Sequence, residues 1–157
     1  MHTEPIEIFN SIETPFYYYD MDLLRETLDV YNSHLNKHNY IAHYAMKANA
    51  EKRIMDEIRK AGFGVDCVSG NEVKLAIKYG FSPDKIVYAG VGKSDKEIKA
   101  ALKAGIYAFN CESIPEIAVI GELAKSMNKV AHISIRVNPD IDAHTHKYIS
   151  TGKKEDK

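Results

Sequence analysis

Hydrophobic residues recur along the chain in short runs that are rich in β-branched and aromatic side chains. The runs cover residues 41–45, 64–68, 86–89, 107–110 and 130–137, and their starts lie roughly 20–25 residues apart. That spacing is the length of one strand, one helix and two short loops. The pattern therefore predicts a series of five βα units.

Amphipathic stretches separate these runs. Within each stretch the apolar residues lie three or four positions apart, which places them on one face of a helix. The four predicted faces contain Ile54, Ile58 and Ala61; Val73, Ala76 and Ile77; Ile98, Ala101 and Leu102; and Ile117, Ile120, Leu123 and Ala124. Helices are therefore expected in the intervals between the predicted strands.

The predicted helix ends repeat in the same phase. Three helices begin with a Ser-x-x-Glu motif, in which the two side chains satisfy free N–H groups of the first turn. The motifs are Ser69/Glu72, Ser94/Glu97 and Ser113/Glu116. Three helices end in Lys-x-Gly followed by an apolar residue, and glycine readily adopts the left-handed conformation that ends a helix. The glycines are Gly62, Gly80 and Gly105.

An aromatic run precedes the first unit, and we predict a strand over residues 16–19. Asp20 can then cap a helix. The apolar face of that helix contains Leu24, Leu28, Tyr31 and Leu35. We therefore expect residues 1–20 to form an N-terminal strand segment that leads into the repeated units of residues 21–157.

Strands that alternate with helices indicate an α/β protein with a parallel sheet. Two architectures fit: an open doubly wound sheet, or a (β/α)8 TIM-type barrel. The regular repeat favours the barrel, of which only about five of the eight βα units are present. We therefore predict a partial barrel.

Composition narrows the class of protein. The chain of 157 residues is 45% hydrophobic, has a net charge of -1 and contains two cysteines. No basic stripe favours nucleic acid, and no apolar run reaches the roughly 20 residues of a membrane helix. The cysteine spacing predicts neither a disulfide framework nor a metal site, so we expect a cytoplasmic protein.

Polar residues gather at the predicted carboxyl ends of the strands, where both architectures bind ligands. In strand order they are Lys47 and Asn49; Asp66 and Ser69; Lys93; Asn110 and Glu112; and Arg136, Asn138, Asp140, Asp142, His144 and His146. This asymmetry favours an enzyme, although a binding barrel would show it too. The pair His144 and His146 has no matching carboxylate or cysteine after it, so we predict no metal site.

Three of these residues have competing interpretations. Lys47 could be a solvated surface lysine, but its small and apolar neighbours suggest a pocket that favours the neutral amine. Asp66 could cap a helix or form a salt bridge, or it could orient a cofactor or balance the positive charge of an imine. Arg136 lies inside an apolar strand, and an arginine buried there needs a partner, so an active-site role is favoured over a salt bridge at the rim.

Several motifs resemble those of the fold-type III enzymes that use pyridoxal phosphate (PLP), a family of alanine racemase-like barrels. Residues 44–49 (Tyr-Ala-Met-Lys-Ala-Asn) resemble the PLP-lysine motif of its diaminopimelate, ornithine and arginine decarboxylases. Residues 64–72 resemble the Gly-x-Asp-x-x-Ser-x-x-Glu segment of the family, and residues 90–94 resemble its turn after strand three. Residues 136–140 and 145–152 most closely resemble the diaminopimelate decarboxylases.

The resemblance implies that Lys47 carries PLP as a Schiff base and that Asp66 and Arg136 support the cofactor. A loop with His146, Tyr148, Ser150 and Thr151 would close over an amino-acid substrate. The implied reaction is decarboxylation of meso-2,6-diaminopimelate to L-lysine by a homodimer. An ornithine- or arginine-type decarboxylase and a non-catalytic PLP-barrel relative that binds a partner remain alternatives.

By resemblance, the chain corresponds to the first third to two fifths of a family member. The remaining strands, the phosphate site and a C-terminal β domain would lie beyond Lys157. We therefore expect an incomplete portion of the enzyme that is inactive by itself.

Overall fold

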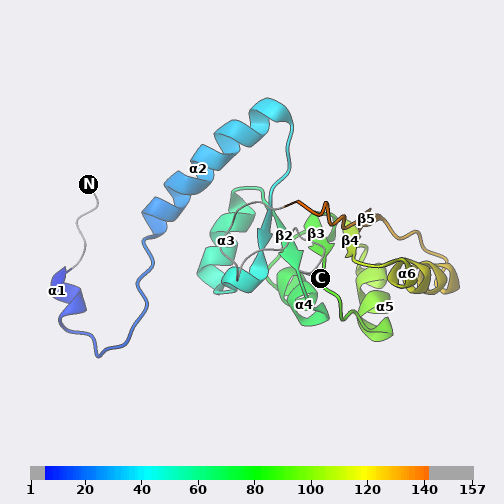
Figure 1. Ribbon diagram of the computed structural model, residues 1–157. Helices are drawn as coiled ribbons and strands as arrows, with labels where there is room; N and C mark the ends of the chain where they lie inside the picture. Colours follow the sequence, from blue (N-terminus) through cyan, green and yellow to red (C-terminus); the bar gives the residue numbers. More distant parts are fainter. Residues whose placement is uncertain (1–5, 142–157) are drawn as a thin grey trace.

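The computed structural model of the chain describes residues 6–141 (Figure 1). Five parallel strands form one sheet in the order β1-β2-β3-β4-β5. They are β1 (His43–Ala45), β2 (Gly64–Cys67), β3 (Ile86–Tyr88), β4 (Ala108–Cys111) and β5 (Ile133–Ile135). Each strand lies next to its predecessor in the sequence, whereas a doubly wound sheet reverses its strand order partway. The order confirms the prediction of a partial barrel.

Helices follow the strands and line one side of the curved sheet (Figure 1). They are α3 (Lys52–Lys60), α4 (Gly70–Lys78), α5 (Asp95–Ala104) and α6 (Ile114–Ser126). The long helix α2 (Met21–His38) precedes β1, and the short helix α1 (Ile6–Phe9) begins the described chain. Two 3-10 turns, η1 (Met46–Ala48) and η2 (Pro83–Lys85), were not predicted.

The helix starts follow the predicted signals. Asp20 accepts hydrogen bonds from the backbone N–H groups of Asp22 and Leu23 at the start of α2. Ser69, Ser94 and Ser113 are the N-cap residues of α4, α5 and α6. The predicted capping serines are therefore confirmed.

The helix ends follow the predicted glycines. Gly62, Gly80 and Gly105 have φ angles of 90°, 86° and 75°, in the left-handed region. The next residue then donates its N–H to a carbonyl in the last turn, as Phe63 does to Ile58 at 3.3 Å and Phe81 does to Ala76 at 3.1 Å. This pattern is the Schellman motif, in which the apolar residue also packs back onto the helix.

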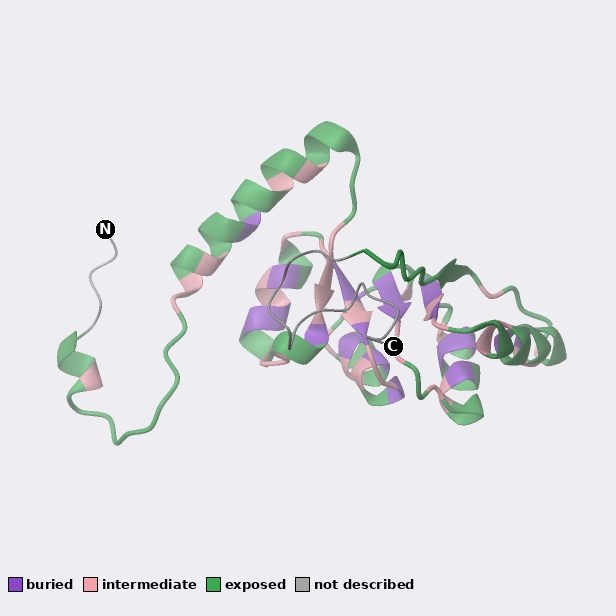
Figure 2. Ribbon diagram, in the orientation of Figure 1, coloured by how far each residue is buried: buried purple, intermediate pink, exposed green. Residues whose placement is uncertain are grey.

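The core lies between the sheet and the helices that line it (Figure 2). Successive side chains of a strand point to opposite faces. Val65 and Cys67 of β2 are fully buried, as are Tyr88 of β3 and Phe109 of β4. The helices contribute residues from the predicted faces, all buried: Ile54, Ile58, Val73, Ala76, Ile98, Ala101, Leu102, Ile120 and Ala124.

The strand predicted over residues 16–19 is wrong. This segment has no regular secondary structure, and Tyr17 is 89% exposed. It runs away from the sheet between α1 and α2 (Figure 1), and its rings pack on other aromatic rings, as Tyr18 does on Phe9 at 4.9 Å between centroids. A strand needs a neighbouring strand for its N–H and C=O groups, and the described sheet provides none here.

Two properties of residues 6–141 bear on function. None of the described helices is both long enough and apolar enough to cross a membrane. Within the same range, no cluster of three or more His, Cys, Asp or Glu side chains is arranged to hold a metal ion.

Candidate functional site

Lys47 is the middle residue of the 3-10 turn η1, at the carboxyl end of β1. The turn is anchored beneath it by Met46, which is 1% exposed. Asn49 fixes the chain after the turn, because its side chain accepts a hydrogen bond from the N–H of Glu51 at 2.9 Å and donates one to the hydroxyl of Tyr19 at 3.1 Å. The lysine is thereby held at the sheet edge where parallel α/β proteins bind ligands.

The side chain of Lys47 is exposed, so the apolar pocket that we expected around it is not formed by the described residues. The neighbours Ala45 and Met46 are apolar, but Met46 packs into the core rather than around the amine. Met46 and Lys47 are consecutive residues of a 3-10 turn, in which successive side chains point in directions about 120° apart. The apolar neighbours of Lys47 in the sequence therefore do not form an apolar pocket around its amine.

Asp66 lies on β2 directly opposite Ala45, two residues before Lys47. Its Oδ1 atom is buried and has no hydrogen-bond partner among residues 6–141. Burial raises the pKa of the Asp66 carboxyl above its usual range, and the positive charges of Lys47 and His43 oppose this shift. An unsatisfied buried carboxylate oxygen is costly unless it binds a ligand or a cation, so Asp66 is suited to receive one.

His43 lies one pleat below Asp66 on the same face of the sheet. Its ring stacks on Tyr107 at 5.9 Å between centroids, and its Nε2 atom is buried without a hydrogen-bond partner. Burial is the main cause that lowers the pKa of His43. The His43 side chain is therefore half-buried, with one ring nitrogen that has no partner among the described residues.

A cavity of about 490 Å³ lies near His43, at the edge of the sheet opposite to Lys47. Its lining includes Asn32 and Asn36 of α2 and Phe63 before β2. Ligands of parallel α/β sheets bind at the carboxyl ends of the strands. The cavity is therefore on the wrong side for the site that contains Lys47.

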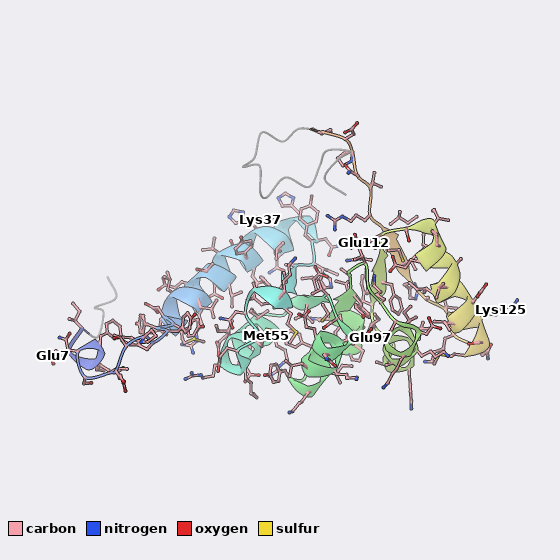
Figure 3. The ribbon with its side chains drawn as sticks, turned by 60° about the horizontal axis from the view of Figure 1, so that its bottom comes forward. Glu7, Lys37, Met55, Glu97, Glu112 and Lys125 are labelled. Carbon is pink, nitrogen blue, oxygen red and sulfur yellow. The ribbon has the colours of Figure 1, made fainter. Side chains whose placement is uncertain are left out.

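Arg136 follows β5 and is 45% exposed, so the prediction that it is buried is wrong. Its Nη1 atom forms an ion pair with Oε2 of Glu112 at 3.3 Å, and its N–H donates to the carbonyl of Cys111 at 2.8 Å. Figure 3 shows Glu112 beside the segment that follows β5. The exposure has a simple cause: β5 is the last strand of the described sheet, so only β4 pairs with it.

The sequence placed Lys93 among the polar residues at the carboxyl ends of the strands but gave no sign that it is buried, and its side chain is 1% exposed. Its Nζ atom donates to the carbonyl oxygens of Gly90 at 2.7 Å and Asn110 at 2.9 Å, and forms an ion pair with Glu116 at 2.5 Å. Nothing in the local sequence distinguishes this lysine from a surface lysine. The carbonyl and the carboxylate that bury it lie 17 and 23 residues later.

The described site thus contains Lys47 and Asp66 on neighbouring units, with Arg136 three strands away from Asp66 at the same edge of the sheet. His146, Tyr148, Ser150 and Thr151, the predicted substrate loop, lie outside the described residues. An exposed primary amine next to a carboxylate with an unsatisfied oxygen can attack a carbonyl carbon and stabilise the resulting cation.

Relatives of known sequence and structure share this arrangement of strands. Residues 21–157 match the family described as "Pyridoxal-dependent decarboxylase, pyridoxal binding domain". The diaminopimelate decarboxylase of Bacteroides thetaiotaomicron is 51% identical over 154 residues, which cover 98% of this chain and 40% of that protein. The chain therefore spans about two fifths of the length of the curated relatives that it matches.

Solved structures give the same result. The crystal structure of diaminopimelate decarboxylase from Helicobacter pylori complexed with L-lysine is similar with a TM-score of 0.84 and 41% identity, over 97% of this chain and 39% of that chain. The ornithine decarboxylase from Entamoeba histolytica is similar with a TM-score of 0.68 and 26% identity, over 84% of this chain and 41% of that chain. Through residues 21–157, the chain belongs to the family of pyridoxal-dependent decarboxylases.

Proposed function

We propose that the protein to which this chain contributes decarboxylates meso-2,6-diaminopimelate to L-lysine, with PLP attached to Lys47. The family and the relatives named diaminopimelate decarboxylase support this proposal. The observation that carries it is the pairing of an exposed amine, Lys47, with the unsatisfied Oδ1 of Asp66 at the carboxyl edge of a parallel sheet.

The residues present fit the cofactor. PLP has an aldehyde, which needs an accessible amine, and Lys47 is exposed. With the cofactor bound, the carboxylate of Asp66 would supply a negative charge and an acceptor on the strand next to Lys47. When bound, PLP accepts the electron pair that the substrate retains after its carboxylate leaves as carbon dioxide.

Three groups of this chain would hold the reacting molecules. Lys47 fixes the cofactor covalently, and Asp66 stabilises positive charge at the attached nitrogen. Arg136 is half-exposed and positively charged beside Glu112, so its guanidinium can contact an anionic or polar group of the bound molecule. The loop of His146, Tyr148, Ser150 and Thr151 is proposed to close over the substrate.

The proposal has further parts that rest on the resemblance. The assembly is a homodimer, the substrate is a small amino acid, and the protein works in the cytoplasm. Cys67 and Cys111 are both free and buried, which agrees with a reducing compartment.

Two measurements on the full-length protein test the proposal. Borohydride reduction in the presence of PLP, followed by peptide mass mapping, should find the pyridoxyl group on Lys47, and Lys47→Ala should lose it. A label on another lysine, or no label, would refute the assignment and favour a non-catalytic relative.

A panel of meso-diaminopimelate, ornithine and arginine then tests the substrate. Of these three substrates, only meso-diaminopimelate should release carbon dioxide, and the other product should be L-lysine. Preferential release of carbon dioxide from ornithine or arginine would instead assign the ornithine- or arginine-type activity. Lys60→Met is a suitable control, because Lys60 pairs with Glu57 on the outer surface of α3.

A further inference from the structure

The buried ammonium group of Lys93 joins two consecutive βα units. The carbonyl of Gly90 belongs to the loop after β3, the carbonyl of Asn110 belongs to β4, and the carboxylate of Glu116 belongs to α6. These contacts use all three N–H donors of the ammonium group. The ring of Tyr88 lies beneath it, 5.4 Å from Nζ to the centroid. A charge that is fully buried and fully bonded holds its partners firmly in position.

Two of these contacts fix the end of β4 on both sides of Cys111. Lys93 binds the carbonyl of Asn110 directly. Glu116, whose Oε1 is held by Lys93, uses its Oε2 to accept the backbone N–H of Glu112 at 2.7 Å. Residues 110 and 112 are therefore both anchored, one directly by Lys93 and the other through Glu116.

The anchored segment is the one that holds Arg136. The carbonyl of Cys111 accepts the N–H of Arg136 at 2.8 Å, and the carboxylate of Glu112 accepts its Nη1–H at 3.3 Å. The backbone and the guanidinium of Arg136 are thus both bonded to a segment that Lys93 and Glu116 keep in place. Lys93 itself donates only to the loop after β3, to β4 and to α6 among the described residues.

We infer that Lys93 is a positioning residue, which with Glu116 aligns the Cys111–Glu112 segment and so orients Arg136 at the cofactor edge. The role of Arg136 toward PLP rests on the proposed function, but the chain of hydrogen bonds from Lys93 to the segment after β5 does not. Lys93→Met removes the charge and all three donors while keeping an unbranched apolar chain.

Hydrogen exchange followed by mass spectrometry on the full-length protein tests the link without cofactor. In Lys93→Met, amides in residues 133–137 should exchange about tenfold faster than in the wild type, because their partner segment loses its anchors. Amides of α3 should keep their wild-type rates. The control Lys60→Met should leave the exchange of residues 133–137 unchanged, since Lys60 lies at the end of α3 and its side chain is 63% exposed.

If Lys93→Met does not fold, Glu116→Gln provides the test. Glutamine keeps an oxygen for the N–H of Glu112 but loses the charge that pairs with Lys93, so faster exchange in residues 133–137 is again expected. Wild-type exchange rates there, in a folded variant of either kind, would overturn the inference. A local role of Lys93 without the link would accelerate exchange near residues 88–94 and 109–112 only.

PLP affinity then tests the consequence at the site. Lys93→Met should weaken PLP binding about tenfold when Arg136 is present and have no further effect in an Arg136→Met background. An equal loss of PLP affinity with and without Arg136 would contradict the inference that Lys93 acts through Arg136. A wild-type protein that fails to bind PLP would refute the proposed function, while the exchange experiment would still decide the role of Lys93.

Discussion

Replacing Gly64 by alanine tests how tightly the first three strands approach one another. Gly64 begins β2, is buried, and lies opposite His43 of β1. A Cβ atom at this position would overlap Cδ2 of the His43 ring and would lie 2.5 Å from the carbonyl oxygen of Lys85, which precedes β3. The added methyl group would therefore be caught between two neighbouring strands.

The size of the effect follows from these two contacts. Added carbon in a packed interior typically costs about 1–3 kcal/mol, and the upper end applies because the Lys85 oxygen belongs to the backbone and cannot rotate away. Alanine also restricts the unfolded chain, which returns about 0.4–1 kcal/mol. We expect a net loss of about 2 kcal/mol in the free energy of unfolding. With a urea dependence of about 2 kcal/mol per M, the midpoint should fall by about 1 M.

The assay is urea unfolding followed by circular dichroism on the full-length protein, with Gly92→Ala as the matched control. A Cβ atom at Gly92 meets no heavy atom within 4 Å, so its midpoint should stay the same or rise slightly. Adding His43→Ala to Gly64→Ala should recover only part of the loss, because the Lys85 contact remains. An unchanged midpoint for Gly64→Ala, or full recovery in the double variant, would refute the reasoning.

Other predictions follow from charge and burial. Burial raises the pKa of Asp66 in the folded protein, so the unfolded chain loses this proton at a lower pH, and the free energy of unfolding falls as pH rises between the two pKa values. Asp66→Asn removes this titration and should reduce the fall in the urea midpoint between acidic and neutral pH. The same variant should weaken PLP binding. Hydrogen bonds, led by that from Arg25, lower the pKa of Glu57 to about 2, so Glu57→Gln should flatten the loss of stability as pH drops from about 4.5 toward 2. Burial raises the pKa of Cys67 to about 12 and also raises that of Cys111, so iodoacetamide should label neither thiol in the folded protein at pH 8 but both in urea, as read by mass spectrometry.

Local signals predicted the βα units because the interactions behind them are local. Ser69 caps α4 through the N–H of Glu72, three residues away, and Gly80 ends the same helix through its own backbone geometry. Such contacts depend on the residues of the motif itself and only weakly on the rest of the fold. The predicted strand at residues 16–19 failed for the opposite reason, because strand formation depends on a partner that is distant in sequence.

The candidate site was only partly predictable. Lys47 was found from its motif and Asp66 from its place at a strand end, but their surroundings were not. Arg136 was expected to be buried because its neighbours in sequence are apolar, yet its exposure is set by the position of β5 in the sheet. Lys93 carried no local signal, since its burial depends on Asn110 and Glu116.

The three glutamates of the repeated Ser-x-x-Glu motif explain where prediction stops. The motif places each glutamate near the start of its helix, but the surrounding fold decides what its carboxylate binds. Glu72 accepts the N–H of Val68 at the end of its own strand. Glu97 binds Ser94 and also accepts the N–H of Gly70 in the preceding helix, where the absence of a side chain lets the two helices approach. Glu116 binds the buried Lys93 of the preceding unit. One repeated sequence signal therefore gives one contact within a unit and two different links between successive units, and the link through Glu116 ends at the residue that would contact the cofactor.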